Sequence, residues 1–339
     1  MIPADNTIHT NPAQGSFSAD AQAPFIQQRA EVDYTVLVPV YFNEGSLEKT
    51  YELIMTQVVA ANPTRSYEFV FIDDGSGDGS YAELLGIKAK NPDNVTVIKL
   101  SRNFGQVSAF MAGYSLARGK CIINISADLQ DPPHLINEML DNHFNHGFQI
   151  VICTREAREE SYFRRKTSKL FYAWMKKLSF KNMPEGGFDF ALISARVKNI
   201  ILSQREANPF WQGQILWTGF AIKWIPYTRL AREIGTSRWT FAKKVKYLLD
   251  GVLSYSYYPL RLMSGIGLIT ALIGFLYALV VIAQYFMGGA PFQGWSPIMI
   301  VLLVVSGLQM LMLGIIGEYL WRTLDQTRNR GQFIIESVK

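Results

Sequence analysis

The sequence has very little cysteine and no repeat. Only two of the 339 residues are cysteine, Cys121 and Cys153, and both fall in apolar runs. They lack the spacing of metal ligands, so we interpret them as small core residues of a protein in a reducing compartment. The absence of an internal repeat and of a heptad pattern excludes a repeat array and a coiled coil.

Charge is missing from a long stretch near the C-terminus. From Leu262 to Gly317 there is no aspartate, glutamate, lysine or arginine. We expect a transmembrane hairpin over 260–321, with helices at about 262–287 and 297–320, because each run is long and apolar enough to cross a bilayer. A buried hairpin in a soluble core is the alternative, and an uncharged stretch of this length disfavours it.

The charges that flank the hairpin predict its orientation. Basic residues precede it, ending at Arg261, and follow it, beginning at Arg322, whereas the linker between the helices has no charge. The positive-inside rule therefore places both termini and the preceding domain in the cytoplasm, at the inner or plasma membrane, and we see no signal peptide that would change this. The net charge of +5 gathers near the membrane, so we expect anionic lipid as a partner and no nucleic acid.

Strand-like and helix-like segments alternate between Tyr34 and Cys153. This alternation predicts an α/β fold with a mostly parallel sheet and helices on both faces. Before the hairpin, apolar residues follow helical spacing and lysines occupy the other faces. This amphipathic pattern predicts a helix lying in the membrane interface, and an ordinary surface helix is the alternative. The expected segments are a disordered tail at 1–31, the sheet domain at 32–239, the interface helix at 240–259, the hairpin, and a cytoplasmic tail at 322–339.

An acidic loop follows the apolar run that ends at Ile125. Within it Asp128 and Gln130 are two residues apart, so in an extended segment both can face the same side. Carboxylate and amide oxygens are suited to Mg²⁺ or Mn²⁺ bound to a diphosphate. The alternative is a solvated turn that ends at Pro132-Pro133.

Two other expected strands also end in polar clusters. One runs into Asp73-Asp74-Gly75-Ser76, and the other ends at the loop 39–44. Because open α/β sheets build their sites at the carboxyl ends of strands, we expect the three clusters to form one rim.

Together these motifs resemble the family 2 glycosyltransferases of GT-A fold, specifically the branch that transfers a sugar from a nucleotide to a polyprenyl phosphate. The resemblance runs from about Tyr34 to the C-terminus and also includes 101–106 and 317–319. It implies an inverting hexosyltransferase with Mg²⁺ or Mn²⁺ as cofactor, undecaprenyl phosphate as acceptor and a UDP-sugar such as UDP-glucose as donor. Dolichyl-type mannosyl transfer from GDP-mannose is the neighbouring alternative, and homo-oligomers occur in the family.

The resemblance assigns roles to individual residues. Asp128 and Asp189 would be catalytic, and Asp128 and Gln130 would bind the metal. The acceptor phosphate would bind to Arg155, Arg164 and Ser168, for which a solvated basic face is the alternative. The nucleotide-sugar site would comprise Pro39, Tyr41, Glu44, Asp73, Asp74, Arg102, Ser126, Arg232 and Arg238.

Four points about these roles stay open at the level of sequence. Asp189 is either a base or a carboxylate that orients the sugar, and Asp74 is alternatively an Asx-turn residue. Phe42 is an extra residue relative to the family's loop pattern. Ser126 stands where the family usually has the first aspartate of Asp-x-Asp, which keeps a catalytically weak scaffold or regulator as a second hypothesis.

Two other functions fit less well. A processive polysaccharide synthase would carry more membrane spans and a Gln-x-x-Arg-Trp motif, whereas Gly235 stands at the glutamine position here. A phospho-receiver built around Asp73-Asp74 would be much shorter and would leave the basic segments without a role.

Overall fold

The computed structural model describes residues 30–155, 184, 187–204, 206–230, 258–287, 295–328 and 330–339. The chain divides into two compact units. The first contains the residues up to Glu138 together with Arg330–Lys339, and the second runs from Met139 to Asn329. Residues 1–29 of the tail expected at 1–31, and residues 240–257 of the interface helix expected at 240–259, lie outside the described residues.

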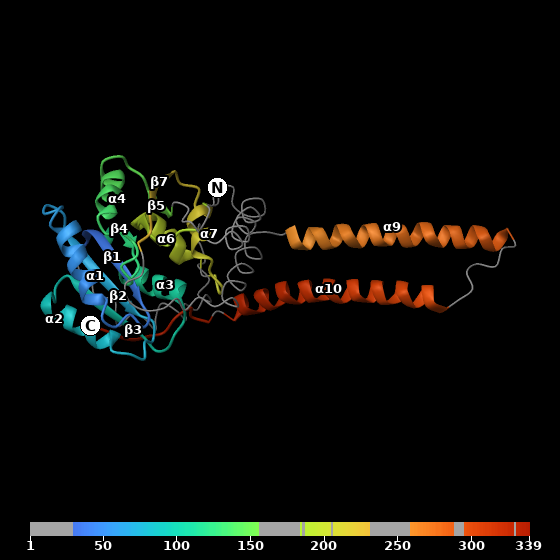
Figure 1. The fold of residues 1–339 in the computed structure, drawn as a ribbon, viewed down its shortest axis with the longest axis horizontal. Helices are drawn as coiled ribbons and strands as arrows, with labels where there is room; N and C mark the ends of the chain where they lie inside the picture. Colours follow the sequence, from blue (N-terminus) through green and yellow to red (C-terminus); the bar gives the residue numbers. More distant parts are fainter. Residues whose placement is uncertain are drawn as a thin grey trace, which may run out of the picture. The chain divides into compact units, whose positions relative to one another are not determined.

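The first unit holds a five-stranded part of the sheet in the order β4-β1-β2-β3-β8 (Figure 1). The first four strands run parallel, and β8 is antiparallel to β3. The C-terminal segment, which the sequence suggested as a tail, thus ends in an edge strand. The bounds are β1 Val32–Val40, β2 Tyr67–Asp73, β3 Val95–Leu100, β4 Gly119–Asn124 and β8 Ile335–Val338.

The helices of the first unit pack their apolar faces on these buried strands. In α1 the side chains of Leu47, Tyr51 and Ile54 are buried. In α3 there is no room for a side chain at Gly113, where a Cβ would lie 2.4 Å from a methyl carbon of Leu37. The helices are α1 Leu47–Ile54 with its π-helical continuation Met55–Val59, α2 Ser80–Lys90, α3 Gln106–Leu116 and α4 Leu135–Phe144, which continues into the second unit.

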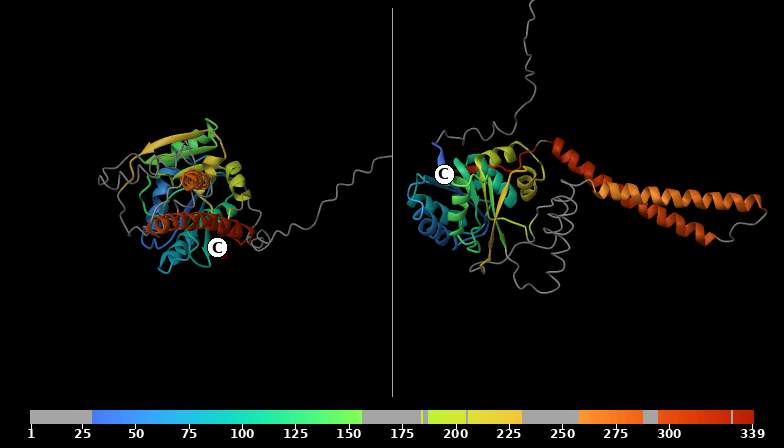
Figure 2. Two further views of the ribbon diagram at one scale, coloured as in Figure 1. Left: turned by 90° about the vertical axis from the view of Figure 1, so that its right-hand side faces the viewer. Right: turned by 90° about the horizontal axis from the view of Figure 1, so that it is seen from above.

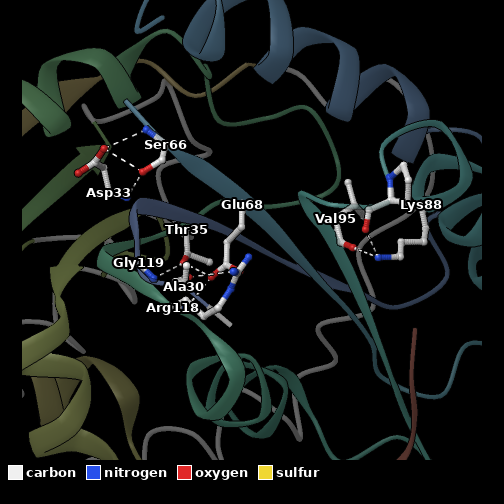
Figure 3. A network of polar contacts seen from close by, with 10 residues as sticks. Ala30, Asp33, Thr35, Ser66, Glu68, Lys88, Val95, Arg118 and Gly119 are labelled. Atoms are coloured by element: carbon white, nitrogen blue, oxygen red, sulfur yellow. Dashed lines mark hydrogen bonds and ion pairs between the residues drawn. The ribbon is translucent and has the colours of Figure 1, made fainter. Parts of the chain in front are cut away.

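A buried ion pair ties the amino-terminal parts of three strands together (Figure 3). Glu68 in β2 is 1% exposed and accepts hydrogen bonds from Thr35 Oγ1 at 2.7 Å and from Arg118 Nε at 2.7 Å. The Thr35 hydroxyl in turn accepts from the backbone of Gly119. Because the carboxylate is fully partnered, its burial is compatible with a stable core. This cluster lies near the starts of the strands, away from the loops that follow their carboxyl ends.

The second unit holds three strands in the order β7-β5-β6. β5 is parallel to β7 and antiparallel to β6. Parallel pairings therefore predominate over the described residues, and the mostly parallel α/β fold expected from the sequence is confirmed. The elements are β5 Ile150–Arg155, β6 Ala191–Ser194, α6 Ala195–Ser203, α7 Trp211–Trp217 and β7 Ile222–Tyr227.

Two long apolar helices complete the second unit, α9 Tyr258–Phe286 and α10 Trp295–Thr327. They run side by side in opposite directions (Figures 1 and 2). They pack closely at Gly267, where a Cβ would lie 2.9 Å from the terminal methyl of Met312. Segments of both are long and apolar enough to cross a membrane, and most of their described apolar side chains are exposed. Exposure of this kind distinguishes them from helices of a soluble core.

Candidate active site

The loops that follow β1, β2 and β4 lie at one edge of the first unit's sheet. β1 is the strand between the other two, and the register pairs Val40 with Asp73 and Leu37 with Asn124. Parallel strands in register bring their carboxyl ends to the same edge. The three polar clusters of the sequence therefore belong to one rim, as expected.

The acidic loop after β4 centres on one hydroxyl between two carboxylates. Ser126 Oγ lies 2.8 Å from Asp128 Oδ1 and 2.6 Å from Asp131 Oδ2. The two aspartates are buried, with 7% and 2% of their surfaces exposed. A hydroxyl has one hydrogen and can donate it to only one of these oxygens. The arrangement thus brings two carboxylates to one hydroxyl.

The backbone of this loop is held in an unusual conformation. Leu129 has φ of 59°, in the left-handed region that non-glycine residues rarely adopt. On the other side of the loop, Ser46 Oγ of the α1 N-terminus and Thr50 Oγ1 donate to Ala127 O at 2.9 and 3.3 Å. Backbone strain that surrounding contacts maintain is concentrated at functional sites. Helix α1 therefore fixes the loop that carries Asp128.

The residues present fit a hard divalent cation. Among the described residues no cluster of three or more His, Cys, Asp or Glu side chains is placed to hold a metal. The carboxylates of Asp128 and Asp131, with the Ser126 hydroxyl, nevertheless form an all-oxygen donor set of the type that Mg²⁺ or Mn²⁺ takes. Because Mg²⁺ is commonly bound through one or two carboxylates plus substrate phosphates, the set is sufficient for a metal–diphosphate complex.

Asp131 is a further candidate that the sequence interpretation did not single out. It lies in the same loop as Gln130, which the sequence predicts as the second ligand because of its spacing from Asp128. The chain turns at Leu129, so the alternation of an extended segment does not apply. The backbone N–H of Gln130 donates to Asp128 Oδ1 at 3.3 Å. The Ser126 hydroxyl contacts both Asp128 and Asp131 because the chain turns at Leu129. No sequence pattern indicates that turn.

The loop after β1 interlocks with the segment after β2. Phe42, the extra residue, has φ of 56°, and its backbone N–H donates to Ser76 Oγ at 3.1 Å. Its ring packs edge-on against Tyr41 at a centroid distance of 4.7 Å. Glu44 accepts from the backbone of Gly79 at 2.9 Å. The backbone thus turns in the left-handed region at Phe42. The Glu44 carboxylate is bound to the segment after β2.

Asp74 organises a second loop of the rim. It is 3% exposed, and its two carboxylate oxygens accept from the backbone N–H groups of Phe104 and Gly105 at 2.7 and 2.9 Å. Burial raises the pKa of Asp74 to about 6, and the two hydrogen bonds oppose this shift. Gly75, with φ of 68°, lies so close to the Arg102 backbone that a Cβ would be 2.6 Å from its carbonyl carbon. The Asp74 side chain therefore holds the segment 102–105 in place.

The Asx-type contact of this region belongs to Asp73. Its Oδ1 accepts from the backbone N–H of Ser76 at 3.2 Å, and burial raises its pKa. Arg102 has an exposed side chain whose guanidinium carbon lies 3.9 Å from the centroid of the Phe104 ring. Pro39 lies within β1, directly before Val40. Of the nucleotide-site candidates described here, Arg102 is the one with a cationic group open to solvent.

In the second unit the structure pairs two candidates. Arg155 at the end of β5 donates from Nη2 to Asp189 Oδ2 at 2.7 Å, and their side chains are 25% and 38% exposed. A guanidinium held by a carboxylate presents its remaining N–H groups in a fixed orientation. The other candidates on the acceptor and phosphate side, Arg164, Ser168, Arg232 and Arg238, lie outside the described residues.

Comparison with known proteins identifies relatives over nearly the whole chain. A model of glycosyl transferase family 2 matches residues 35–199. The uncharacterized glycosyltransferase YkcC of Bacillus subtilis is 33% identical over 306 residues, 90% of this chain and 94% of the relative. A prophage bactoprenol glucosyl transferase homolog of Escherichia coli is 32% identical over 308 residues, 90% of this chain and 99% of the relative.

Solved structures give a more distant match. Glucosyl-3-phosphoglycerate synthase of Mycobacterium tuberculosis, solved with Mn²⁺ and UDP-glucose, is 14% identical with a TM-score of 0.44, covering 69% of this chain and 81% of that chain. The full-length sequence relatives decide the assignment. The chain belongs to glycosyl transferase family 2 and is a glycosyltransferase.

Proposed function

We propose that this glycosyltransferase transfers a sugar from a nucleotide sugar, UDP-glucose by preference, to undecaprenyl phosphate with inversion. The observation that carries the proposal is that one chain combines a family 2 domain with two apolar helices and matches 98–99% of the length of relatives named as bactoprenol glucosyl transferases or their homologs. A polyprenyl acceptor is confined to the bilayer, so its transferase needs a membrane anchor of this kind.

We propose that both flanks of the hairpin face the cytoplasm. The distribution of lysine and arginine supports this orientation, because the linker between the helices carries no charge. The catalytic part then works on the cytoplasmic leaflet, where it meets the nucleotide sugar, and the product is a polyprenyl-phosphate sugar for later cell-envelope glycan or lipid modification.

On the donor side the acidic loop carries the chemistry. Asp128 and Asp131 would hold the divalent cation with Ser126 between them, and the cation would neutralise charge on the departing diphosphate. Arg102 adds a positive charge open to solvent at the same rim. Asp74 supports the donor site through the 102–105 segment, because its carboxylate is hydrogen-bonded to that backbone.

On the acceptor side the phosphate is its own nucleophile. Its second pKa is near 6, so at neutral pH it is mostly dianionic and needs no general base. A phosphate oxygen attacks the anomeric carbon in line, the bond from that carbon to the nucleoside diphosphate breaks, and the electron pair leaves with the diphosphate. Arg155, with Arg164 and Ser168, would bind the phosphate. Asp189 would orient the Arg155 guanidinium through their ion pair.

The test is transfer of label from radiolabelled UDP- and GDP-sugars into organic-extractable lipid. Purified full-length protein, undecaprenyl phosphate and Mg²⁺ or Mn²⁺ are combined, with Asp128→Asn as the control. Label entering lipid from UDP-glucose, and lost in the control, supports the proposal. Label from GDP-mannose alone would replace the donor. No label from any donor, with donor binding intact, would favour the scaffold that the serine at position 126 suggests.

A further inference from the structure

The C-terminal end of α10 is hydrogen-bonded to the loop that precedes α7. Asn208 Nδ2 donates to Asp325 Oδ2 at 3.0 Å, and the backbone N–H of Ala207 donates to Gln326 Oε1 at 2.8 Å. All four residues belong to the second unit. We call this contact between Ala207–Asn208 and Asp325–Gln326 the hairpin latch.

The latch lies beyond the apolar part of α10. Glu318 is the first charged residue after the uncharged stretch, and it pairs with Arg322 one turn later at 3.0 Å. Asp325 follows about two turns after Gly317, roughly 12 Å along the helix axis. Since the headgroup layer adds about 5–8 Å on each side of the hydrocarbon core, Asp325 would lie at its outer surface when the apolar part spans the bilayer.

From the latch, packed contacts lead into the second unit's core. Helix α7 begins at Trp211, shortly after Asn208, and Trp211 packs against Phe188 with ring centroids 5.5 Å apart. Gln212 Nε2 donates to Phe188 O at 2.6 Å. These three side chains are 1%, 5% and 1% exposed for Trp211, Gln212 and Phe188. Close packing of this kind transmits displacement with little loss.

Phe188 is the residue before Asp189, which pairs with Arg155. The backbone carbonyl that Gln212 holds is therefore that of the peptide leading directly into Asp189. A shift of the α7 start would move this peptide and with it the orientation of the guanidinium. Reaction rates are sensitive to misplacement of about 1 Å, even when the cause is remote.

We infer that Asn208 and Asp325 are positioning residues for the lipid acceptor. The latch sets the height of the Arg155–Asp189 pair over the membrane surface, where a lipid phosphate lies. Gln212 passes this constraint from α7 to the peptide before Asp189. The inference rests on the proposed function, because it gives the pair a lipid phosphate to meet.

The test exchanges the two groups of the latch. Asn208→Asp sets two carboxylates against each other, whereas Asn208→Asp combined with Asp325→Asn restores the hydrogen bond with donor and acceptor exchanged. Thr323→Ala is the matched control, because the Thr323 hydroxyl donates to the Tyr319 carbonyl within the same helix. KM values for undecaprenyl phosphate and for the nucleotide sugar are measured with full-length protein in lipid nanodiscs.

For Asn208→Asp we expect the acceptor KM to rise about tenfold, with the donor KM unchanged, since a like-charge pair opens the latch without touching the rim. In the double variant with the two groups exchanged, the acceptor KM should return to within about twofold of the wild-type value. The acceptor KM of Thr323→Ala should equal that of the wild type. A merely structural role would change both KM values or lower the melting temperature without rescue by the exchange. Either of those results, or an unchanged acceptor KM, would overturn the inference.

A cross-link tests the contact without using activity. Cysteines replace Asn208 and Asp325, and a short bifunctional thiol reagent is applied to intact membranes; the native Cys121 and Cys153 are buried. Efficient cross-linking is expected, and its absence would contradict the latch. Wild-type protein that transfers no sugar to lipid would overturn the proposed function and this inference together. Wild-type transfer with a normal acceptor KM in Asn208→Asp would overturn the inference alone.

Discussion

At the scale of the residue, one hydroxyl lies between two buried carboxylates in the loop where we propose the donor site. The resemblance leads one to expect Asp-x-Asp at this point, and here the two carboxylates near Ser126 are those of Asp128 and Asp131. The turn at Leu129 brings Asp131 into the same cluster, so two carboxylates lie near Ser126 without an aspartate at position 126. This arrangement favours a working metal site over a scaffold.

Ser126→Ala should weaken metal binding by about tenfold, because groups that orient ligating carboxylates typically contribute 10–100-fold to affinity. Titration of Mn²⁺ in the presence of UDP, followed by electron paramagnetic resonance, measures the change. Ser115→Ala is the control, since the Ser115 hydroxyl bonds the Ala112 carbonyl of its own helix. Unchanged Mn²⁺ affinity in Ser126→Ala would remove the hydroxyl from the metal site.

The pKa of Asp74, raised to about 6, makes stability depend on pH. The folded protein holds this proton more tightly than the unfolded chain, whose pKa is near 3.9. The contribution of Asp74 is therefore greatest below about pH 4 and is lost as pH rises through 6, a difference of about 3 kcal/mol.

Asp74→Asn should remove this pH dependence. The difference in melting temperature between wild type and variant, measured from pH 4 to 8, should change most between pH 4 and 6. The variant should also raise the donor KM, because the amide NH2 would replace one of the two acceptor oxygens and face the backbone N–H of Phe104 or Gly105. Parallel melting profiles across this range would contradict the assignment of the pKa to Asp74.

At the scale of the element, helix α3 is fixed against the sheet by a glycine. At Gly113 a Cβ would come within 2.4 Å of Leu37 and 2.9 Å of Ile72, both in strands of the rim. Because Gly113 has no side chain, α3 packs close to the sheet. Gly105, at the N-terminal end of α3, therefore lies within hydrogen-bond distance of Asp74. Packing at the centre of the helix therefore supports the site at its end.

Gly113→Ala should lower the free energy of unfolding by about 1–3 kcal/mol, as overpacking of a buried site does. Gly86→Ala, at a position in α2 where a Cβ meets nothing within 4 Å, should be stabilising by up to about 1 kcal/mol. Thermal melting of the two variants in detergent makes the comparison. Equal melting temperatures would mean that α3 can move away from the sheet at little cost.

At the scale of the whole molecule, the two apolar helices decide where the enzyme works. Their described apolar side chains are mostly exposed, which supports the proposal that they span a membrane. The charges at their ends then predict which side the glycosyltransferase occupies.

The orientation is testable by single cysteines in intact cells. Gly289→Cys, in the linker, should react with a membrane-impermeant maleimide from outside. Arg328→Cys, after α10, should react only once the membrane is opened, because the positive-inside rule keeps its flank in the cytoplasm. The buried native cysteines give a low background. The opposite pattern would invert the proposed topology.

Sequence alone determined the features that depend on local pattern. The periodicity predicted the strands and helices from Tyr34 to Cys153, and the uncharged stretch predicted the hairpin. The polar clusters after three strands predicted the rim. The family resemblance supplied the expected chemistry. Each of these signals is carried by neighbouring residues or by composition, so a linear reading is sufficient.

Only the tertiary structure decided which residues meet across distance. Asp131 lies near Asp128 because the chain turns at Leu129. Asp74 accepts from a backbone N–H 30 residues later in the sequence. Asn208 donates to Asp325, which is 117 residues later. Such contacts depend on the exact path of the backbone and on packing between elements. No periodicity records them, because each partner looks like an ordinary polar residue in its own segment.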